Sequence, residues 1–486
     1  MHNIQPFVKS INKNRGIVYI LLILAIIFLA KVIGNSLLSS VLSIGIAFSV
    51  FFIFDNLFWV TFTFIYASCP AGLFNQYTFG LNLGEVVVDF SQLLFIALLI
   101  KVWNIRPVFP RFYKPFLIIL LFVVIINVLN GALSGFSEIR ILFRVFKLLL
   151  PFSFIYIFPR IIRNEVDFRY FFRMIFPFVF IAFAAQLLVF PLGVPPSVSI
   201  FGWEFQNAEN IIGEVNAKEE LSRYAFSTLL LTMALMGSMY YLNVRGKPFN
   251  RYYLGLIMFT CFFSVVLAGS RSWTIGLGTS IILWSLMSFR RIKKILLPGL
   301  GIILLVFLIR HNLPVINHQL DMALTRIKTF ELFAEGDITA GETSSRFDIR
   351  GPTVMKAFHK TNPLIGAGYS EFFFNNADGH VGHQSLLLQS GYLGYILLNL
   401  FIIYLILKQL FLYLRSGTTD SRVALIAGSL ILLGLYIILP GLAIFSYMAS
   451  PENGTFYGVY LTFVGFFSHR TRLEKYLINS SGINHN

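Results

Sequence analysis

About fourteen long apolar segments recur along this chain, and they constrain its fold more than any other feature of the sequence. A helix rises about 1.5 Å per residue, so roughly 20 apolar residues cross the ~30 Å hydrocarbon core of a bilayer. The segments occupy residues 17–33, 36–54, 56–69, 83–100, 115–134, 138–158, 171–192, 221–243, 252–268, 272–289, 295–310, 383–407, 423–446 and 454–468. The sequence therefore predicts an all-α, polytopic helical membrane protein.

The composition supports this prediction. Hydrophobic residues make up 57% of the 486 residues and charged residues only 12%, which is more apolar surface than a soluble core of this length buries. The two cysteines, Cys69 and Cys261, lie in different apolar segments, so neither a disulfide framework nor a Cys-x-x-Cys motif is present. Redox chemistry is not expected.

The positions of the cations predict the orientation of the helices. About two thirds of the 38 Lys and Arg residues fall in alternate connections, for example at 101–114, 160–173 and 290–294. Cytoplasmic connections are enriched in Lys and Arg, so this alternation places both termini in the cytoplasm. The net charge of +16 is then explained by loops near anionic lipid, and no nucleic-acid partner is expected.

Two outer segments are long, near 193–220 and at 311–382. Long loops in compact proteins are usually functional or disordered. We therefore divide the chain into residues 1–310, with the first eleven membrane helices, 311–382, a large outer loop containing short helices, and 383–486, with the last three helices and a cytoplasmic tail.

Several basic residues on the outer side are candidates for anion binding. Arg140, Arg144 and Lys147 follow one another at helical spacing, which places three cations on one face of a helix near the outer interface. They suit a multiply charged anion such as a lipid pyrophosphate, or alternatively extend to outer headgroups or pair with Glu138. Arg223 begins another helix beside Lys218, Glu219 and Glu220, where local ion pairs are the alternative.

Arg271 lies in the short Gly269-Ser-Arg-Ser turn on the outer side. A guanidinium group held there presents a planar fork that matches phosphate oxygens. An arginine that merely anchors the helix at the interface is the alternative interpretation.

His383 immediately precedes a long apolar helix, so the sequence places its side chain at a helix N-terminus. The positive end of the helix dipole favours a neutral imidazole there, and a neutral imidazole can act as a general base. A capping or interfacial histidine is the alternative. The chain contains no Walker A loop, HExxH, GxSxG or Cys/His metal spacing, so we expect no metal and no cofactor.

Four motifs in order, Gly269-Ser-Arg-Ser, Ser344-Ser-Arg346-Phe, Pro363-Leu-Ile-Gly-Ala-Gly and His383-Gln-Ser-Leu-Leu-Leu-Gln-Ser-Gly-Tyr-Leu-Gly, resemble those of the O-antigen polymerase and ligase superfamily. The resemblance covers roughly residues 200–410. The chain has Gln384 where the family often has Asn, and Arg350 near a position where the family often has Trp.

The resemblance implies a GT-C-like, metal-independent, inverting glycosyltransferase that uses undecaprenyl-pyrophosphate-linked oligosaccharides on the periplasmic side of the bacterial inner membrane. By the same resemblance, Arg271 and Arg346 hold the pyrophosphate and His383 activates the acceptor hydroxyl. Arg140, Arg144, Lys147, Arg223 and Arg350 are further candidates for substrate binding.

Three functions remain open at the level of the sequence. A polymerase that joins lipid-linked repeat units is favoured, with a chain-length regulator as a possible protein partner. A ligase that transfers the glycan to lipid A-core or to a protein would use the same donor and leaving group. A lipid-linked oligosaccharide transporter is less favoured, because here the charge collects on one side around a long loop rather than along a central cavity.

Overall fold

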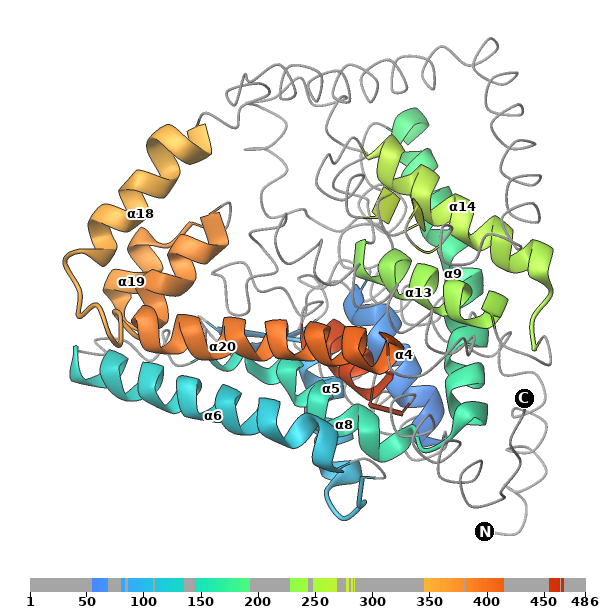
Figure 1. Cartoon of the computed structure of the whole chain (residues 1–486), viewed down its shortest axis with the longest axis horizontal. Coiled ribbons are helices and arrows are strands. Elements are labelled where there is room, and N and C mark those ends of the chain that lie inside the picture. Colours follow the sequence, from blue (N-terminus) through green and yellow to red (C-terminus); the bar gives the residue numbers. More distant parts are fainter. Residues whose placement is uncertain are drawn as a thin grey trace. The chain divides into compact units, whose positions relative to one another are not determined.

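The computed structural model describes residues 55–68, 80–83, 86–107, 110–134, 143, 145–147, 149–192, 228–243, 248–268, 277–278, 281–282, 284, 345–378, 381–414, 454–463 and 465–466. These residues are mostly helical, with one short β-hairpin (Figure 1). The chain divides into two compact units, Met1–Arg106 with Arg160–Leu231 and Pro107–Pro159 with Thr232–Asn486.

The first unit is built around helix α4, Asn56–Ser68, which packs against α5, Phe90–Val102, and α9, Glu165–Leu192. Asp55 caps α4 by accepting a hydrogen bond from the Phe58 N–H at 2.8 Å. Asn164 and Asp167 exchange hydrogen bonds in a capping box at the start of α9, with distances of 3.0 and 3.3 Å. Helix capping therefore explains the presence of Asp55 and Asp167 at these positions, and no catalytic role is needed to account for them.

The hairpin in the first unit differs from the sequence prediction. Strands β1, Gly80–Leu83, and β2, Val86–Asp89, pair antiparallel, whereas a helix was predicted from residue 83. The run of three valines in β2 is apolar enough to extend a hydropathy segment, but β-branched residues also favour strands. The helix itself begins at Phe90.

The second unit contains helices α6, Pro110–Leu133, and α20, Gly382–Leu414, which lie side by side (Figure 1). It also contains α14, Arg251–Leu267, most of α13, Thr228–Asn243, and a helical segment at 454–463. Phe116 of α6 contacts Phe401 of α20, with ring centroids 4.9 Å apart.

A proline interrupts the helix that the sequence predicted at 138–158. The described part contains a 3₁₀ turn, η1, at Leu150–Ser153, followed by α8, Phe154–Ile161. Pro151 has no backbone N–H to donate, so a continuous α-helical hydrogen-bond ladder is not available at this point.

Helix α6 exposes an apolar face. Its residues Ile118, Leu121, Ile125, Leu129 and Leu133 follow one another at intervals of three or four, and each is more than half exposed. Only 28% of its most apolar window is buried within the protein, whereas the core helix of a soluble protein would be mostly buried. This face suits contact with hydrocarbon rather than water.

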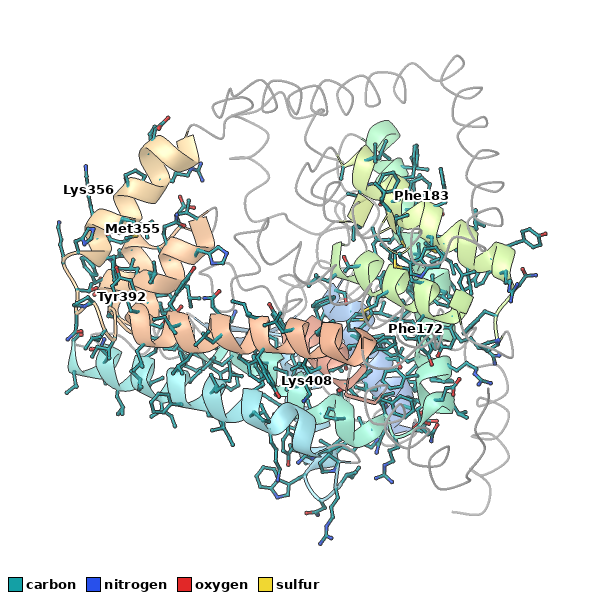
Figure 2. The ribbon with its side chains drawn as sticks, in the orientation of Figure 1. Phe172, Phe183, Met355, Lys356, Tyr392 and Lys408 are labelled. Atoms are coloured by element: carbon teal, nitrogen blue, oxygen red, sulfur yellow. The ribbon has the colours of Figure 1, made fainter. Side chains whose placement is uncertain are left out.

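The C-terminal part of α20 shows the same pattern. Leu393, Ile396, Leu400, Ile403 and Leu407 form a partly exposed apolar stripe, while Leu398 and Phe401 are buried. Lys408, labelled in Figure 2, lies near the end of this stripe. Its ammonium is 5.4 Å from the centroid of the Tyr404 ring. The two packed helices therefore present lipid-compatible surfaces away from their contact.

Among the described residues, two helices are long and apolar enough to cross a membrane, Lys114–Leu133 and Glu165–Leu188. Shorter apolar helices occur at Ser91–Val102, Leu229–Leu242 and Arg251–Leu267. Their positions agree with predicted segments. The predicted segments at 17–33, 36–54, 295–310 and 423–446 lie outside the described residues, so the full number of crossings and the location of the termini stay predictions.

Candidate functional site

Short helices form a compact cluster in the second half of the predicted outer loop. A π-helical turn, η4, at Ser345–Arg350 leads into α18, Gly351–Phe358, and α19 occupies Glu371–Asn376. Together with the start of α20 they share one apolar core, which includes Val354, Phe358, Tyr369, Phe373 and Leu388. We call this the α18–α20 cluster. The described part of residues 311–382 therefore contains short helices.

Val145 belongs to the same apolar core, and only 6% of its surface is exposed. The predicted anion-binding residues Arg144 and Lys147 are close to Val145 in the sequence, and Lys147 lies in the same described helical stretch. Lys147 is partly buried, whereas Arg144 lies outside the described residues. The structure thus brings this basic segment to the same core as α18 and α20.

Helix α20 is broken at Gly391, which has φ 61° and ψ −171°. This backbone region is essentially restricted to glycine. The sequence predicted one continuous helix over 383–407, and the structure corrects this to two halves, Gly382–Ser390 and Tyr392–Leu414. The second half lies along α6, while the first belongs to the α18–α20 cluster (Figure 1).

The loop at 363–368 closes this break with four backbone hydrogen bonds. The N–H groups of Ala367 and Gly368 donate to the carbonyls of Leu388 and Gln389, at 2.7 and 2.8 Å. In return, the N–H groups of Tyr392 and Leu393 donate to the carbonyls of Pro363 and Leu364, at 2.9 and 3.0 Å. The loop therefore satisfies the backbone groups that the break would otherwise leave unpaired in an apolar setting.

Glycines allow the close approach that these hydrogen bonds need. A Cβ atom on Gly391 would lie 2.3 Å from the Leu364 carbonyl, and one on Gly366 would lie 2.6 Å from the Gln389 carbonyl oxygen. Both residues have positive φ, as does Gly368. The two motifs Pro363-Leu-Ile-Gly-Ala-Gly and Gln389-Ser-Gly-Tyr are therefore the two sides of one contact.

Helix α6 holds the other side of the loop. The Asn130 side-chain amide donates to the Gly366 carbonyl at 2.8 Å, and the Tyr369 N–H donates to the Asn127 carbonyl at 2.9 Å. Burial raises the pKa of the Tyr369 phenol above its ordinary value, so this side chain stays neutral. The loop, α6 and the broken helix thus form one hydrogen-bonded junction.

His383 lies in the first turn of α20, as the sequence predicted, and is partly buried. Its Nδ1 atom is 3.4 Å from the hydroxyl oxygen of Tyr395, and the two rings meet edge to face with centroids 6.0 Å apart. Tyr395 lies beyond the break, in the second half of α20. Sequence reasoning missed this partner, because residues separated by 12 positions do not meet on an unbroken helix.

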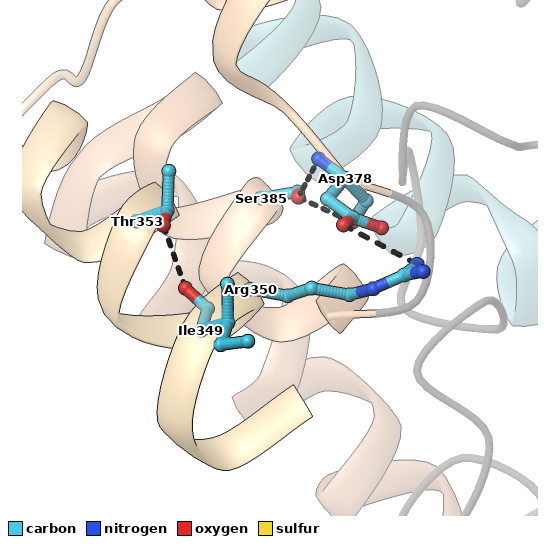
Figure 3. Close-up of polar contacts among 5 residues, drawn as sticks. All are labelled: Ile349, Arg350, Thr353, Asp378 and Ser385. Carbon is cyan, nitrogen blue, oxygen red and sulfur yellow. Dashed lines mark hydrogen bonds and ion pairs between the residues drawn. The ribbon is translucent and has the colours of Figure 1, made fainter. Parts of the chain in front are cut away.

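The segment before His383 is tied to the end of η4 (Figure 3). Arg350 forms an ion pair with Asp378, with Nη1 and Oδ2 3.6 Å apart. The Ser385 hydroxyl accepts from the Asp378 N–H at 2.9 Å and donates to the Asp378 carbonyl at 2.7 Å. Arg350 was predicted to bind substrate, and here its partner is a carboxylate of the protein itself.

The remaining predicted site residues are described only in part. The Arg346 backbone lies in η4, four residues before Arg350, but its side chain lies outside the described set. Arg140, Arg223 and Arg271 also lie outside the described residues, so their roles stay predictions. Within the part of the chain that the structure describes, no group of three or more His, Cys, Asp and Glu side chains is arranged to hold a metal ion.

Comparison with known proteins adds no family assignment, because no family model matches the chain and no curated protein matches it significantly. The candidate site is therefore defined by its own chemistry. It combines a partly buried imidazole at a helix start with basic residues on two neighbouring segments.

Proposed function

We propose that this chain is a bacterial inner-membrane glycosyltransferase that polymerises lipid-linked oligosaccharide repeat units, as an O-antigen polymerase does. The observation that carries the proposal is the meeting of three separate segments at one apolar core. These are the segment with Val145 and Lys147, the helix that follows Arg346 and Arg350, and the first turn of α20 with His383. The sequence indicates anion binding or base chemistry for a residue in each of the three segments.

The chemistry of glycosyl transfer fits such a constellation. The acceptor hydroxyl oxygen forms a bond to the anomeric carbon while the bond from that carbon to the pyrophosphate oxygen breaks, with inversion at the carbon. The hydroxyl proton passes to the His383 imidazole as the bond forms. Negative charge develops on the departing lipid pyrophosphate, and fixed cations stabilise this charge more in the transition state than in the ground state.

The lipid setting also supports the proposal. Helices α6 and α20 both have exposed apolar faces. α20 also contacts α18, so these faces lie on helices that lead to the α18–α20 cluster. A lipid-anchored donor could approach from such a face while its pyrophosphate stays at the interface. The inner membrane, its periplasmic face and the count of about fourteen crossings belong to the same proposal.

A His383→Ala variant tests the base, with His359→Ala as the matched control. His359 is an exposed histidine in the same cluster, and its ring contacts only Phe358 among the aromatic rings of the described residues. In cells that depend on this chain for their surface polysaccharide, we expect His383→Ala to abolish the polymer ladder and His359→Ala to preserve it. A normal ladder in the His383→Ala strain would exclude the general-base role.

The same experiment separates polymerase from ligase. Glycolipid that carries a single repeat unit indicates lost polymerisation, whereas lipid-linked polymer that accumulates without reaching its acceptor indicates lost ligation. Arg271→Lys and Arg346→Lys retain the charge but lose the bidentate fork. Full activity of both lysine variants would argue against bidentate pyrophosphate binding.

A further inference from the structure

The contact between His383 and Tyr395 depends on the break in α20. Residues 12 positions apart on a continuous helix are separated by roughly 18 Å along the axis. Here the imidazole Nδ1 and the phenol oxygen are 3.4 Å apart, because Gly391 turns the chain between them. The 363–368 loop holds that turn through its four backbone hydrogen bonds.

We propose that Tyr395 is a positioning residue, which accepts a hydrogen bond from Nδ1–H of His383 and thereby leaves Nε2 unprotonated toward the acceptor sugar. The inference rests on the proposed general-base function of His383. It assigns a role to a residue in the second half of α20 and to the helix break that brings this residue to the histidine.

The tautomer decides whether His383 can act as a base. A neutral imidazole carries one proton, and only the nitrogen without it can accept another. A neutral imidazole without a partner tends to carry its proton on Nε2, which would leave Nε2 unable to accept a proton. An acceptor at Nδ1 stabilises the opposite tautomer. The Tyr395 hydroxyl, which can either accept or donate, lies 3.4 Å from Nδ1, and the proposal assigns it the acceptor role.

The structure then fixes both the backbone and the imidazole ring of His383. Its backbone lies in a turn that is pinned by the paired hydrogen bonds between Ser385 and Asp378. Its ring meets the Tyr395 ring edge to face, with an angle of 75° between the planes. A base that is held in one orientation aligns with the incoming hydroxyl without losing further side-chain freedom in the transition state.

The test uses the full-length protein in detergent micelles, with histidine labelled at both ring nitrogens. The chain has eight histidines, and the His383→Ala spectrum identifies the His383 signals by their absence. We expect nitrogen chemical shifts of His383 that report a protonated Nδ1 in the wild-type protein. In Tyr395→Phe we expect the proton to move toward Nε2.

Tyr392→Phe is the matched control. Tyr392, labelled in Figure 2, lies three residues before Tyr395. The centroid of its ring is 5.5 Å from that of Phe358. Removing this hydroxyl leaves the contact between His383 and Tyr395 in place, so the His383 spectrum should not change. Matching thermal melts of the two phenylalanine variants show that both remain folded.

Kinetics with a lipid-linked donor supply the second readout. Tyr395→Phe should lower kcat roughly two- to tenfold with little change in KM, as expected for one lost neutral hydrogen bond. A wild-type His383 that carries its proton on Nε2, or a tautomer that Tyr395→Phe leaves unchanged, would overturn the inference. These spectra do not depend on activity, so they separate a failure of the Tyr395 role from a failure of the glycosyltransferase proposal.

Discussion

Replacing Gly391 with alanine should destabilise the second unit severely, because this position combines backbone strain with a close approach. The backbone conformation, φ 61° and ψ −171°, costs a residue with a side chain about 1–3 kcal/mol. The new Cβ would also lie 2.3 Å from the carbon and oxygen of the Leu364 carbonyl, well inside the ~3.5 Å at which such atoms normally touch. The loop therefore has to move away.

Moving the loop breaks the hydrogen bonds that close the helix. The N–H groups of Tyr392 and Leu393 lose their acceptors on Pro363 and Leu364. In an apolar setting such as lipid, each donor left without a partner costs about 1–3 kcal/mol. With the backbone strain included, the loss is roughly 3–9 kcal/mol, which is comparable to the ~5–15 kcal/mol stability of a whole folded protein.

The assay is the fraction of purified protein that stays monodisperse after heating in detergent. We expect Gly391→Ala to melt far below the wild-type protein or to fail to accumulate in the membrane. Gly278→Ala is the control, because a Cβ there would meet its nearest neighbour, Phe262 Cε2, at an ordinary 3.5 Å, and alanine favours helix over glycine. A Gly391→Ala protein that melts like the wild type would refute the described break and its closure.

Two further predictions concern lipid contact and burial. Ile125→Lys, on the exposed apolar face of α6, should reduce the amount of protein in the membrane, because a lysine at the centre of a bilayer costs about 2.5–3.5 kcal/mol. Thr353→Lys, at an exposed position of α18, should leave that amount unchanged. Equal yields of the two variants would show that the α6 face meets water. Tyr369→Phe should remove a loss of stability at alkaline pH. Burial raises the pKa of Tyr369, so above about pH 10 the unfolded chain releases a proton that the folded chain keeps, and wild-type stability falls as the pH rises further. Melting temperatures measured from pH 9 to 11 in the two proteins check this, and parallel curves would contradict it.

The helices were largely predictable from the sequence because apolar segments of membrane length leave few alternatives. α6, α9 and α14 all lie where hydropathy placed them. The break in α20 was not predicted, because the only local sign of it is Gly391 itself, and a glycine inside a long helical segment is compatible with a continuous helix. Its hydrogen-bond partners are on a loop more than 20 residues earlier, and local patterns contain no information about such pairing.

The position of His383 at a helix start was predictable from the sequence, but its contacts were not. His383 lies at a helix start as predicted, because the beginning of a long apolar run is visible in the sequence. Its contact with Tyr395 and the ion pair of Arg350 with Asp378 arise from tertiary packing between separate segments. The glycine in Gln389-Ser-Gly-Tyr was the one available signal, since a glycine inside a helical pattern often marks a functional or packing constraint.

The junction between α6 and the 363–368 loop also has a consequence for how the protein is made. The Asn130 amide finds its acceptor on Gly366 only after 236 further residues have been synthesised. At roughly 5–20 residues per second, α6 waits on the order of ten to fifty seconds for that partner. During this interval the Asn130 amide has to be accommodated by the insertion machinery or by another helix. The loop and the broken helix are close in sequence and can pair soon after they emerge.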